Sequence, residues 1–302
     1  MAEVHHFTYG AFNPVAATLV AFVGAYLGTL SAARARQART RGRRTRWFVI
    51  AAFAIGGGIW LMHFAALLGF DLPGSPVRYG IGMTALGLAL TVLSVGAGLM
   101  LHGHGRRGSG RLVMAGAITG LGLLAAHYAG MHAVHVAGVL HYRTVLVAVS
   151  GLGTVVAAVL ALAWVTTARG WWRGIAAGAA TAVVMCGAHY GNMAAIQVEL
   201  APPGPNGVDG LRPLLMIVPV ILVTTVITIG VAFSALQAMT EEVFTDGAGV
   251  SRRGAHAGTS WSLRQTTIAM TLHQREPGPR PSPLPVPPRP ASGHPERDST
   301  AV

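Results

Sequence analysis

The sequence lacks lysine and carries few charges of either sign. Of its 302 residues, 22 are basic and 10 are acidic, and only 11% are charged, whereas 52% are apolar. Soluble domains carry roughly a quarter charged residues, so this composition excludes an ordinary soluble protein. All 22 basic residues are arginines. A retinal Schiff base and a Walker-type phosphate loop are therefore excluded, because both need a lysine.

Cysteine and membrane-embedded carboxylates are also scarce. Cys186 is the only cysteine, so the chain forms no internal disulfide and no thiolate metal cage. The only acids between residues 4 and 240 are Asp71, Glu199 and Asp209, all in polar breaks or at their edges. A carboxylate proton relay has no residues to use, which weighs against ion-coupled transport. No segment combines a nucleophile with a base and an orienting acid, so we expect no enzymatic activity.

Seven apolar segments are each long enough to cross the bilayer's hydrocarbon core of about 30 Å as a helix. They cover residues 12–33, 47–70, 79–101, 112–138, 144–167, 172–198 and 213–236. The sequence therefore predicts an all-α membrane protein, a seven-transmembrane helix bundle within residues 1–236. Residues 237–302 are polar and rich in arginine and proline, with nine prolines between 277 and 295. We expect this second region to be a disordered cytoplasmic tail.

Arginine alternates between the breaks that separate these segments. Seven arginines lie in residues 34–46, three in 102–111 and two in 169–173, against one in each of the other three breaks. The positive-inside rule then predicts an amino terminus outside the cell membrane and a carboxyl terminus in the cytoplasm. The bilayer, and its anionic inner-leaflet lipid in particular, is the expected partner of these arginines. A nucleic-acid partner is not expected, since no polar basic domain is present.

Three similar strings recur in the second, fourth and sixth segments. They are MHFAAL from Met62, AHYAGM from Ala126 and AHYGNM from Ala188. Their histidines, His63, His127 and His189, lie 64 and then 62 residues apart, the length of one helix hairpin with its loops. The spacing predicts three pseudo-repeated helix hairpins around an axis along the membrane normal. Each histidine lies 15 to 17 residues into its segment, so all three fall at one level near the outer face.

Methionines share helix faces with two of these histidines. Met131 lies four residues after His127, and Met185 and Met193 flank His189 at the same spacing, which places each set on one face. Polar groups inside a membrane are expensive and usually functional. Imidazole with thioether is a soft ligand set that suits copper, Cu(I) above all.

Other polar residues lie close to the three histidines. Tyr128 and Tyr190 follow two of them, and they either hydrogen-bond to the site or anchor the helices at the membrane interface. His135 continues the face of His127, and His132 either extends the site or faces water.

The strings GIWLMHF, GLLAAHYAGM and GAHYGNMAA, with their hairpin spacing, resemble the MHYT family of bacterial integral membrane sensor proteins. The resemblance covers residues 9–236 and implies a sensory role, with copper bound near the outer face and oxygen, carbon monoxide or nitric oxide as the signal. The ligands it implies are Met62, His63, His127, Met131, His189 and Met193. The chain departs from the family pattern where Ala126 and Ala188 replace the leading methionine and Leu67 replaces a later one.

The resemblance also implies signalling output. Many members carry a cyclase, phosphodiesterase or kinase module after the membrane domain, so we expect this chain to signal through segment 213–236 and its tail to a cytoplasmic partner. Two alternatives remain open from the residues alone. Histidines that face one another across the bundle could hold b-type haem in a redox membrane protein. The bundle could also serve as a metal or solute transporter.

Overall fold

The computed structural model describes residues 10–105, 108–201 and 207–213, with scattered positions from 215 to 240. The described residues form six long helices: α1 Phe12–Gln37, α2 Arg41–Leu67, α3 Ile81–Gly103, α4 Ser109–His132, α5 Thr144–Thr167 and α6 Trp171–Met193. They also form four short strands: β1 Arg78–Tyr79, β2 Val134–His135, β3 Gly138–Tyr142 and β4 Ile196–Leu200. The predicted helical character is confirmed, although the strands depart from a purely α-helical fold.

Helices α1 to α5 are each long and apolar enough to cross a membrane, so the chain is a multi-pass membrane protein. Helix α6 has 23 residues but is less apolar, because it contains His189, Asn192 and four glycines. The described positions of segment 213–236 are helical as well. The predicted tail lies outside the described residues from 241 onward.

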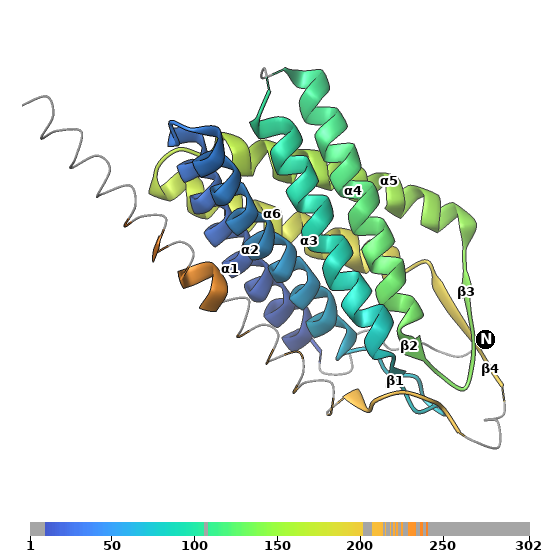
Figure 1. Ribbon diagram of the computed structural model, residues 1–302. Helices are drawn as coiled ribbons and strands as arrows, with labels where there is room; N and C mark the ends of the chain where they lie inside the picture. The colour runs from blue at the N-terminus through green and yellow to red at the C-terminus, as the bar shows by residue number, and fades with distance from the viewer. Residues whose placement is uncertain are drawn as a thin grey trace, which may run out of the picture. The chain divides into compact units, whose positions relative to one another are not determined.

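The six helices form a closed ring of antiparallel neighbours. Each helix packs against the next in sequence, and α6 packs back against α1. Figure 1 shows α1 to α4 running side by side, with the strands at the end where α2 and α4 finish. The ring thus consists of three hairpins, α1–α2, α3–α4 and α5–α6. Its second helices, α2, α4 and α6, alternate around the ring and run in the same direction.

Small residues allow these helices to approach closely. A Cβ on Gly58 would lie 2.9 Å from the Gly24 Cα, and one on Gly24 would lie 2.6 Å from the Ala54 carbonyl oxygen. Gly116 and Gly120 of α4 meet the backbone of α5 at Val159 and Val155 in the same way, each with a Cβ-to-Cα distance of 2.6 Å. Backbone contact of this kind is the usual basis of helix packing in membranes.

The strands form a cap over one end of the ring. β1 pairs with β2, and β3 pairs with β4, both antiparallel. The cap has its own apolar cluster, which includes Phe64, Tyr79, Val134, Ile196 and Val198. It joins the ends of α2, α4 and α6, so the three hairpins are held together where the repeated strings lie.

The cap also corrects two predicted boundaries. Segments 112–138 and 172–198 were expected to be helical throughout, but α4 ends at His132 and α6 at Met193. The residues beyond are rich in Val and Ile and alternate in burial, which favours a strand. His135 therefore lies in β2 and not on the α4 face, and its Nδ1 is 2.9 Å from the Asp209 carbonyl oxygen.

The arginine-rich break at residues 34–46 is mostly helical. α1 continues to Gln37 and α2 starts at Arg41, so only three residues connect them. Arginine is a good helix former, which explains why the helices extend into this region. Thr40 caps α2 by accepting a hydrogen bond from the Arg43 backbone N–H at 3.3 Å.

Candidate metal centre

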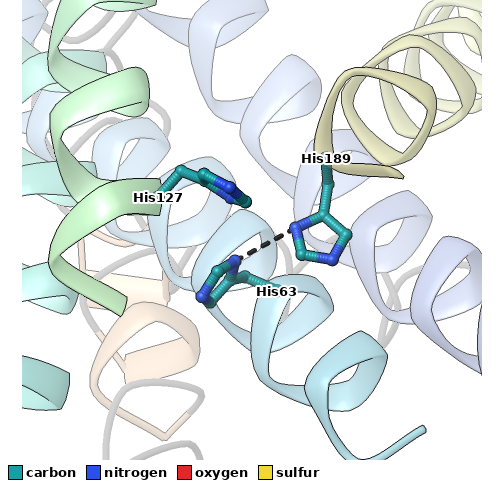
Figure 2. A group of neighbouring side chains, drawn as sticks. All are labelled: His63, His127 and His189. Atoms are coloured by element: carbon teal, nitrogen blue, oxygen red, sulfur yellow. Dashed lines mark hydrogen bonds between the residues drawn. The ribbon is translucent and has the colours of Figure 1, made fainter. Parts of the chain in front are cut away.

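Three histidines meet at the centre of the ring, one from each hairpin. His63 comes from α2, His127 from α4 and His189 from α6, and Figure 2 shows the imidazoles pointing toward one another. Their ring centroids are 4.9 to 5.3 Å apart. One potential ligand atom from each residue lies within 4.8 Å of the other two. Residues that the sequence separates by more than sixty positions therefore form one cluster.

The threefold arrangement of the hairpins explains this convergence. Each histidine lies four or five residues before the end of its helix, so the three lie at one level. The positions four residues before each histidine also face the axis, where Ile59, Leu123 and Met185 form a layer next to the imidazoles, here called the axial layer. The positions four residues after each histidine are Leu67, Met131 and Met193, and all three are buried in the cap cluster.

Two of the imidazoles are in hydrogen-bond contact. His63 Nδ1 and His189 Nδ1 are 3.1 Å apart, as the dashed line in Figure 2 marks. One of these nitrogens donates and the other accepts, because two N–H groups or two lone pairs would repel. The Nε2 atoms of His63 and His127 are buried without a hydrogen-bond partner. Buried polar atoms without partners are rare and call for an explanation, such as a bound ion or water.

Gly130 makes room for His63. A Cβ at this position would lie only 2.2 Å from His63 Nε2. Gly130 is the third residue after His127, and the equivalent positions in the other repeats are Ala66 and Asn192. The second repeat therefore has no side chain at the position against which the imidazole of the first repeat packs.

The imidazoles line a cavity of about 50 Å³. Its other walls are the axial layer together with Trp60, Thr91, Ala126, Thr154, Ala188 and Asn192. Trp60 is fixed by a hydrogen bond of 3.1 Å from its Nε1 to the Thr84 carbonyl oxygen. The cavity exceeds the roughly 10–15 Å³ that one water molecule needs, and its mostly apolar walls include the polar side chains of the histidines, Thr91, Thr154 and Asn192. An ion with one small ligand therefore fits here.

The methionines are distributed differently from the implied ligand set. Met131 and Met193 are buried in the cap cluster, and Met62 is buried in the helix core beside His63. Met185, which is not in the implied set, lines the cavity together with the three imidazoles. The sequence identified the stripe of Met185, His189 and Met193, but it did not indicate which end of the stripe adjoins the site.

Tyr128 and Tyr190 pack edge-on against the imidazoles that they follow. Their ring centroids lie 5.2 Å from His127 and 5.1 Å from His189. Neither tyrosine lines the cavity. Tyr128 also packs against Tyr142, with the two ring centroids 5.5 Å apart. The structure thus places both tyrosines behind the histidines as packing partners. The hydrogen bonds expected of them to the site remain a prediction.

Sequence reasoning did not identify Asn192 and Thr154 as residues of the site. Asn192 is 2% exposed and donates from Nδ2 to Thr154 Oγ1 at 2.9 Å. A comparison of the three strings contains the signal, because the third residue after each histidine is alanine, glycine and then asparagine. A polar side chain at a position that is small in the other repeats marks a difference between the repeats.

Comparison with known proteins agrees with this architecture. The family model of the MHYT repeat, described as a bacterial signalling protein N-terminal repeat, matches residues 56–115 and 120–178. The first match contains His63 and the second contains His127. No solved structure matches the chain significantly.

Two relatives come from Pseudomonas aeruginosa. The bifunctional diguanylate cyclase/cyclic di-GMP phosphodiesterase MucR is 31% identical over 277 residues, which is 88% of this chain and 39% of that protein. The cyclic di-GMP phosphodiesterase NbdA is 33% identical over 163 residues, 54% of this chain and 20% of that protein.

A third relative is an uncharacterized signaling protein of Caulobacter vibrioides, 28% identical over 155 residues, 51% of this chain and 19% of that protein. The chain thus spans less than half the length of these relatives, and it aligns with the sensor part of those named as enzymes and not with their catalytic domains. The repeat matches, the similarity to these relatives and the ring of hairpins lead to one conclusion: the chain is a membrane signalling protein of the bacterial MHYT family.

Proposed function

We propose that this chain is the sensor part of a bacterial signalling system and that it binds copper at His63, His127 and His189. The convergence of the three imidazoles on one buried cavity carries this proposal. Binding would bias the packing of α2, α4 and α6, since each contributes one ligand. A ligand that contacts three hairpins can favour one arrangement of them over another, which a sensor requires.

The donor set fits a copper ion. Two nitrogens on one tetrahedral metal ion stand about 3.3 Å apart when each metal–nitrogen bond is about 2.0–2.1 Å. The Nδ1 atoms of His63 and His189 are already 3.1 Å apart, so these two imidazoles need little movement to share an ion. Imidazoles suit copper and zinc alike, and because Met185 lines the same cavity, its soft thioether near the ion would favour Cu(I). When bound, copper would supply Lewis-acid and one-electron redox chemistry.

Haem is a weaker candidate at this site. A haem iron held by two histidines requires the planar macrocycle to lie between them, which the contact of 3.1 Å between His63 and His189 does not allow. Cofactor-sized pockets measure roughly 300–1,000 Å³. The cavity here measures about 50 Å³, which favours an ion with at most a small ligand.

A diatomic gas is a second candidate for the signal. A separate cavity of about 30 Å³ lies on the other side of the axial layer, with Ile55, Thr119 and Thr181 from α2, α4 and α6 among its walls. Apolar cavities of this kind bind small apolar guests. Only the axial layer would separate a gas held there from a metal at the imidazoles.

We also propose the seven-span topology, with the histidine end outside. Helices α1 to α5 satisfy the length and apolarity of a span, and α6 closes the ring between α5 and α1. The arginine-rich connection between α1 and α2 lies at the end opposite to the cap. By the positive-inside rule this opposite end faces the cytoplasm.

Signal output would run from the cap to segment 213–236. Tyr79 of β1 donates its hydroxyl to the Leu67 carbonyl oxygen at 3.1 Å, which joins β1 to the end of α2. The backbone of Tyr79 also exchanges two hydrogen bonds with Leu211, at 2.9 and 3.0 Å, just before that segment. We take the membrane part to sense without catalysis of its own, since it aligns with the sensor part of relatives named as enzymes.

Metal analysis of the purified protein tests this proposal. We expect copper in near-equimolar amount after growth with copper, and loss of that copper in a His63→Ala/His127→Ala/His189→Ala variant. A matched variant, His102→Ala/His135→Ala/His141→Ala, removes three histidines outside the cluster and is expected to retain copper. Equal copper content in the two triple variants would contradict the proposal.

A further inference from the structure

Asn192 breaks the threefold symmetry of the histidine site. It occupies the position that Ala66 and Gly130 occupy in the other two repeats, so only the third hairpin brings an amide to the cavity. The side chain is 2% exposed, and a buried amide must satisfy its donors and its acceptor inside the protein.

The hydrogen bonds of Asn192 fix which way its amide points. Nδ2 lies 2.9 Å from the Ala188 carbonyl oxygen, which can only accept. Nδ2 also lies 2.9 Å from Thr154 Oγ1, and that hydroxyl uses its own hydrogen on the Ser150 carbonyl oxygen. Both neighbours therefore need a donor, so the nitrogen faces them and a flipped amide is excluded. The oxygen, Oδ1, is the atom that remains.

This oxygen is buried without a hydrogen-bond partner. Leaving a buried acceptor unsatisfied costs stability, so the folded protein gains from any guest that donates to it. The cavity that Asn192 lines has room for such a guest, and all three imidazoles line the same cavity. One small molecule with a hydrogen to donate and a lone pair to share would satisfy groups on both sides.

We propose that Asn192 selects the fourth ligand of this site, and that this ligand carries a hydrogen, as water or hydroxide does. The inference rests on the proposed copper site. An ion held by the three imidazoles alone would have room for a further ligand, and the cavity has space for one beside them. A water or hydroxide in that space would share its lone pair with the metal and donate its O–H to Asn192 Oδ1.

The same oxygen disfavours ligands that have no hydrogen. Carbon monoxide, nitric oxide and oxygen bring only lone pairs toward Oδ1, so they leave it unsatisfied and must first displace the water. Asn192 thus acts as a specificity-determining residue that lowers the affinity for diatomic gases. Its removal opens the site to them.

Infrared spectroscopy of carbon monoxide on the Cu(I)-loaded protein tests the inference. Asn192→Leu removes the acceptor with a side chain of similar size. We expect it to bind carbon monoxide about 10-fold more tightly, the factor that corresponds to one lost hydrogen bond of about 1.4 kcal/mol. We also expect its C–O stretch to fall, because the Oδ1 lone pair no longer opposes electron donation from copper into the C–O bond.

Thr91→Val is the matched control. Thr91 also lines the cavity, but its hydroxyl donates within its own helix to the Gly87 carbonyl oxygen at 2.7 Å. This variant is expected to keep the wild-type affinity and frequency. If Asn192→Leu fails to fold, Asn192→Ala replaces it, because alanine is the residue of the first repeat at this position.

The outcomes separate the two proposals. Absence of both copper and a carbon monoxide band in the wild type would overturn the copper site. Copper and a band in the wild type, with the same affinity and frequency in the Asn192 variants, would overturn the role of Asn192 and leave the copper site intact. Equal changes in Thr91→Val and Asn192→Leu would also overturn it, since they would reflect a general loss of polarity.

Discussion

His63 Nδ1 and His189 Nδ1 lie 3.1 Å apart, although 126 residues separate them in the sequence. The contact joins the first hairpin to the third, so it forms only when α6 closes the ring against α1. A site built across this closure depends on the whole bundle and not on one helix. Changes in helix packing and changes in metal binding should therefore influence each other in both directions.

Substitution of Gly130 tests how closely the histidines are fitted. Gly130→Ala places a Cβ 2.2 Å from His63 Nε2, so the imidazole must shift from its position in the cluster. We expect copper affinity to fall by at least 10-fold, measured by competition with a Cu(I) chelator. Gly187→Ala on α6 is the control, because a Cβ there meets no atom within 4 Å. Equal affinities in the two variants would contradict the fit described here.

Methionine substitutions distinguish the two ends of the α6 stripe. Met185→Leu removes the thioether on the cavity and is expected to weaken Cu(I) binding while leaving zinc binding nearly unchanged. Met131→Leu and Met193→Leu change residues in the cap cluster and should leave the affinity for either ion as it is. Weaker Cu(I) binding in the cap variants but not in Met185→Leu would contradict this expectation and would support Met131 and Met193 as ligands. The measurement is a paired Cu(I) and Zn²⁺ titration.

The difference between these methionines shows what the sequence could predict and what it could not. Spacing gave the three histidines, their common level and the face that each shares with residues four positions away. Periodicity does not say which neighbour on that face lies closer to the side chain. Side chains on a helix lean toward its amino terminus, so His189 reaches toward Met185 and not toward Met193.

Other parts of the fold depended on contacts between repeats. The ends of α4 and α6 were predicted too far along, because an apolar run such as that after His132 reads equally as helix or strand. The pairing of β1 with β2 and of β3 with β4 makes these residues strands. Because each pair connects segments that are distant in the sequence, local patterns do not reveal it. Asn192 was missed for a related reason, since its importance appears only when the hairpins are superimposed.

Close helix packing should govern stability. Gly58→Ala forces a Cβ to within 2.9 Å of the Gly24 Cα, so α1 and α2 must separate. We expect a loss of about 1–3 kcal/mol in unfolding free energy, the range for overpacked cores. Thermal unfolding in detergent measures it, and Gly153→Ala, whose Cβ meets no atom within 4 Å, is expected to be neutral or stabilising. Equal melting temperatures would show that this contact is not tight.

The Tyr79–Leu211 pair should carry the signal to segment 213–236. Leu211→Pro removes the backbone N–H that donates to the Tyr79 carbonyl oxygen at 3.0 Å, whereas Leu211→Ala keeps it. A spin label at Val231 is expected to respond to Cu(I) in wild type and in Leu211→Ala, and to respond less in Leu211→Pro. An undiminished response in Leu211→Pro would place the coupling elsewhere.

Copper affinity should depend on pH in one direction. The imidazoles must be deprotonated to bind a metal ion, so protons compete with copper and the affinity falls as the pH is lowered. Chelator competition at several pH values measures this, with corrections for the chelator's own protonation. An affinity that does not change with pH would argue against histidine ligands.

The most direct test of the central claim is a Cu(I) titration of the purified protein against a competing chelator. We expect one Cu(I) per chain in the wild type, at least a 10-fold loss of affinity in each of His63→Ala, His127→Ala and His189→Ala, and no specific binding in the triple variant. Wild-type affinity in the triple alanine variant would contradict a metal centre at these three histidines.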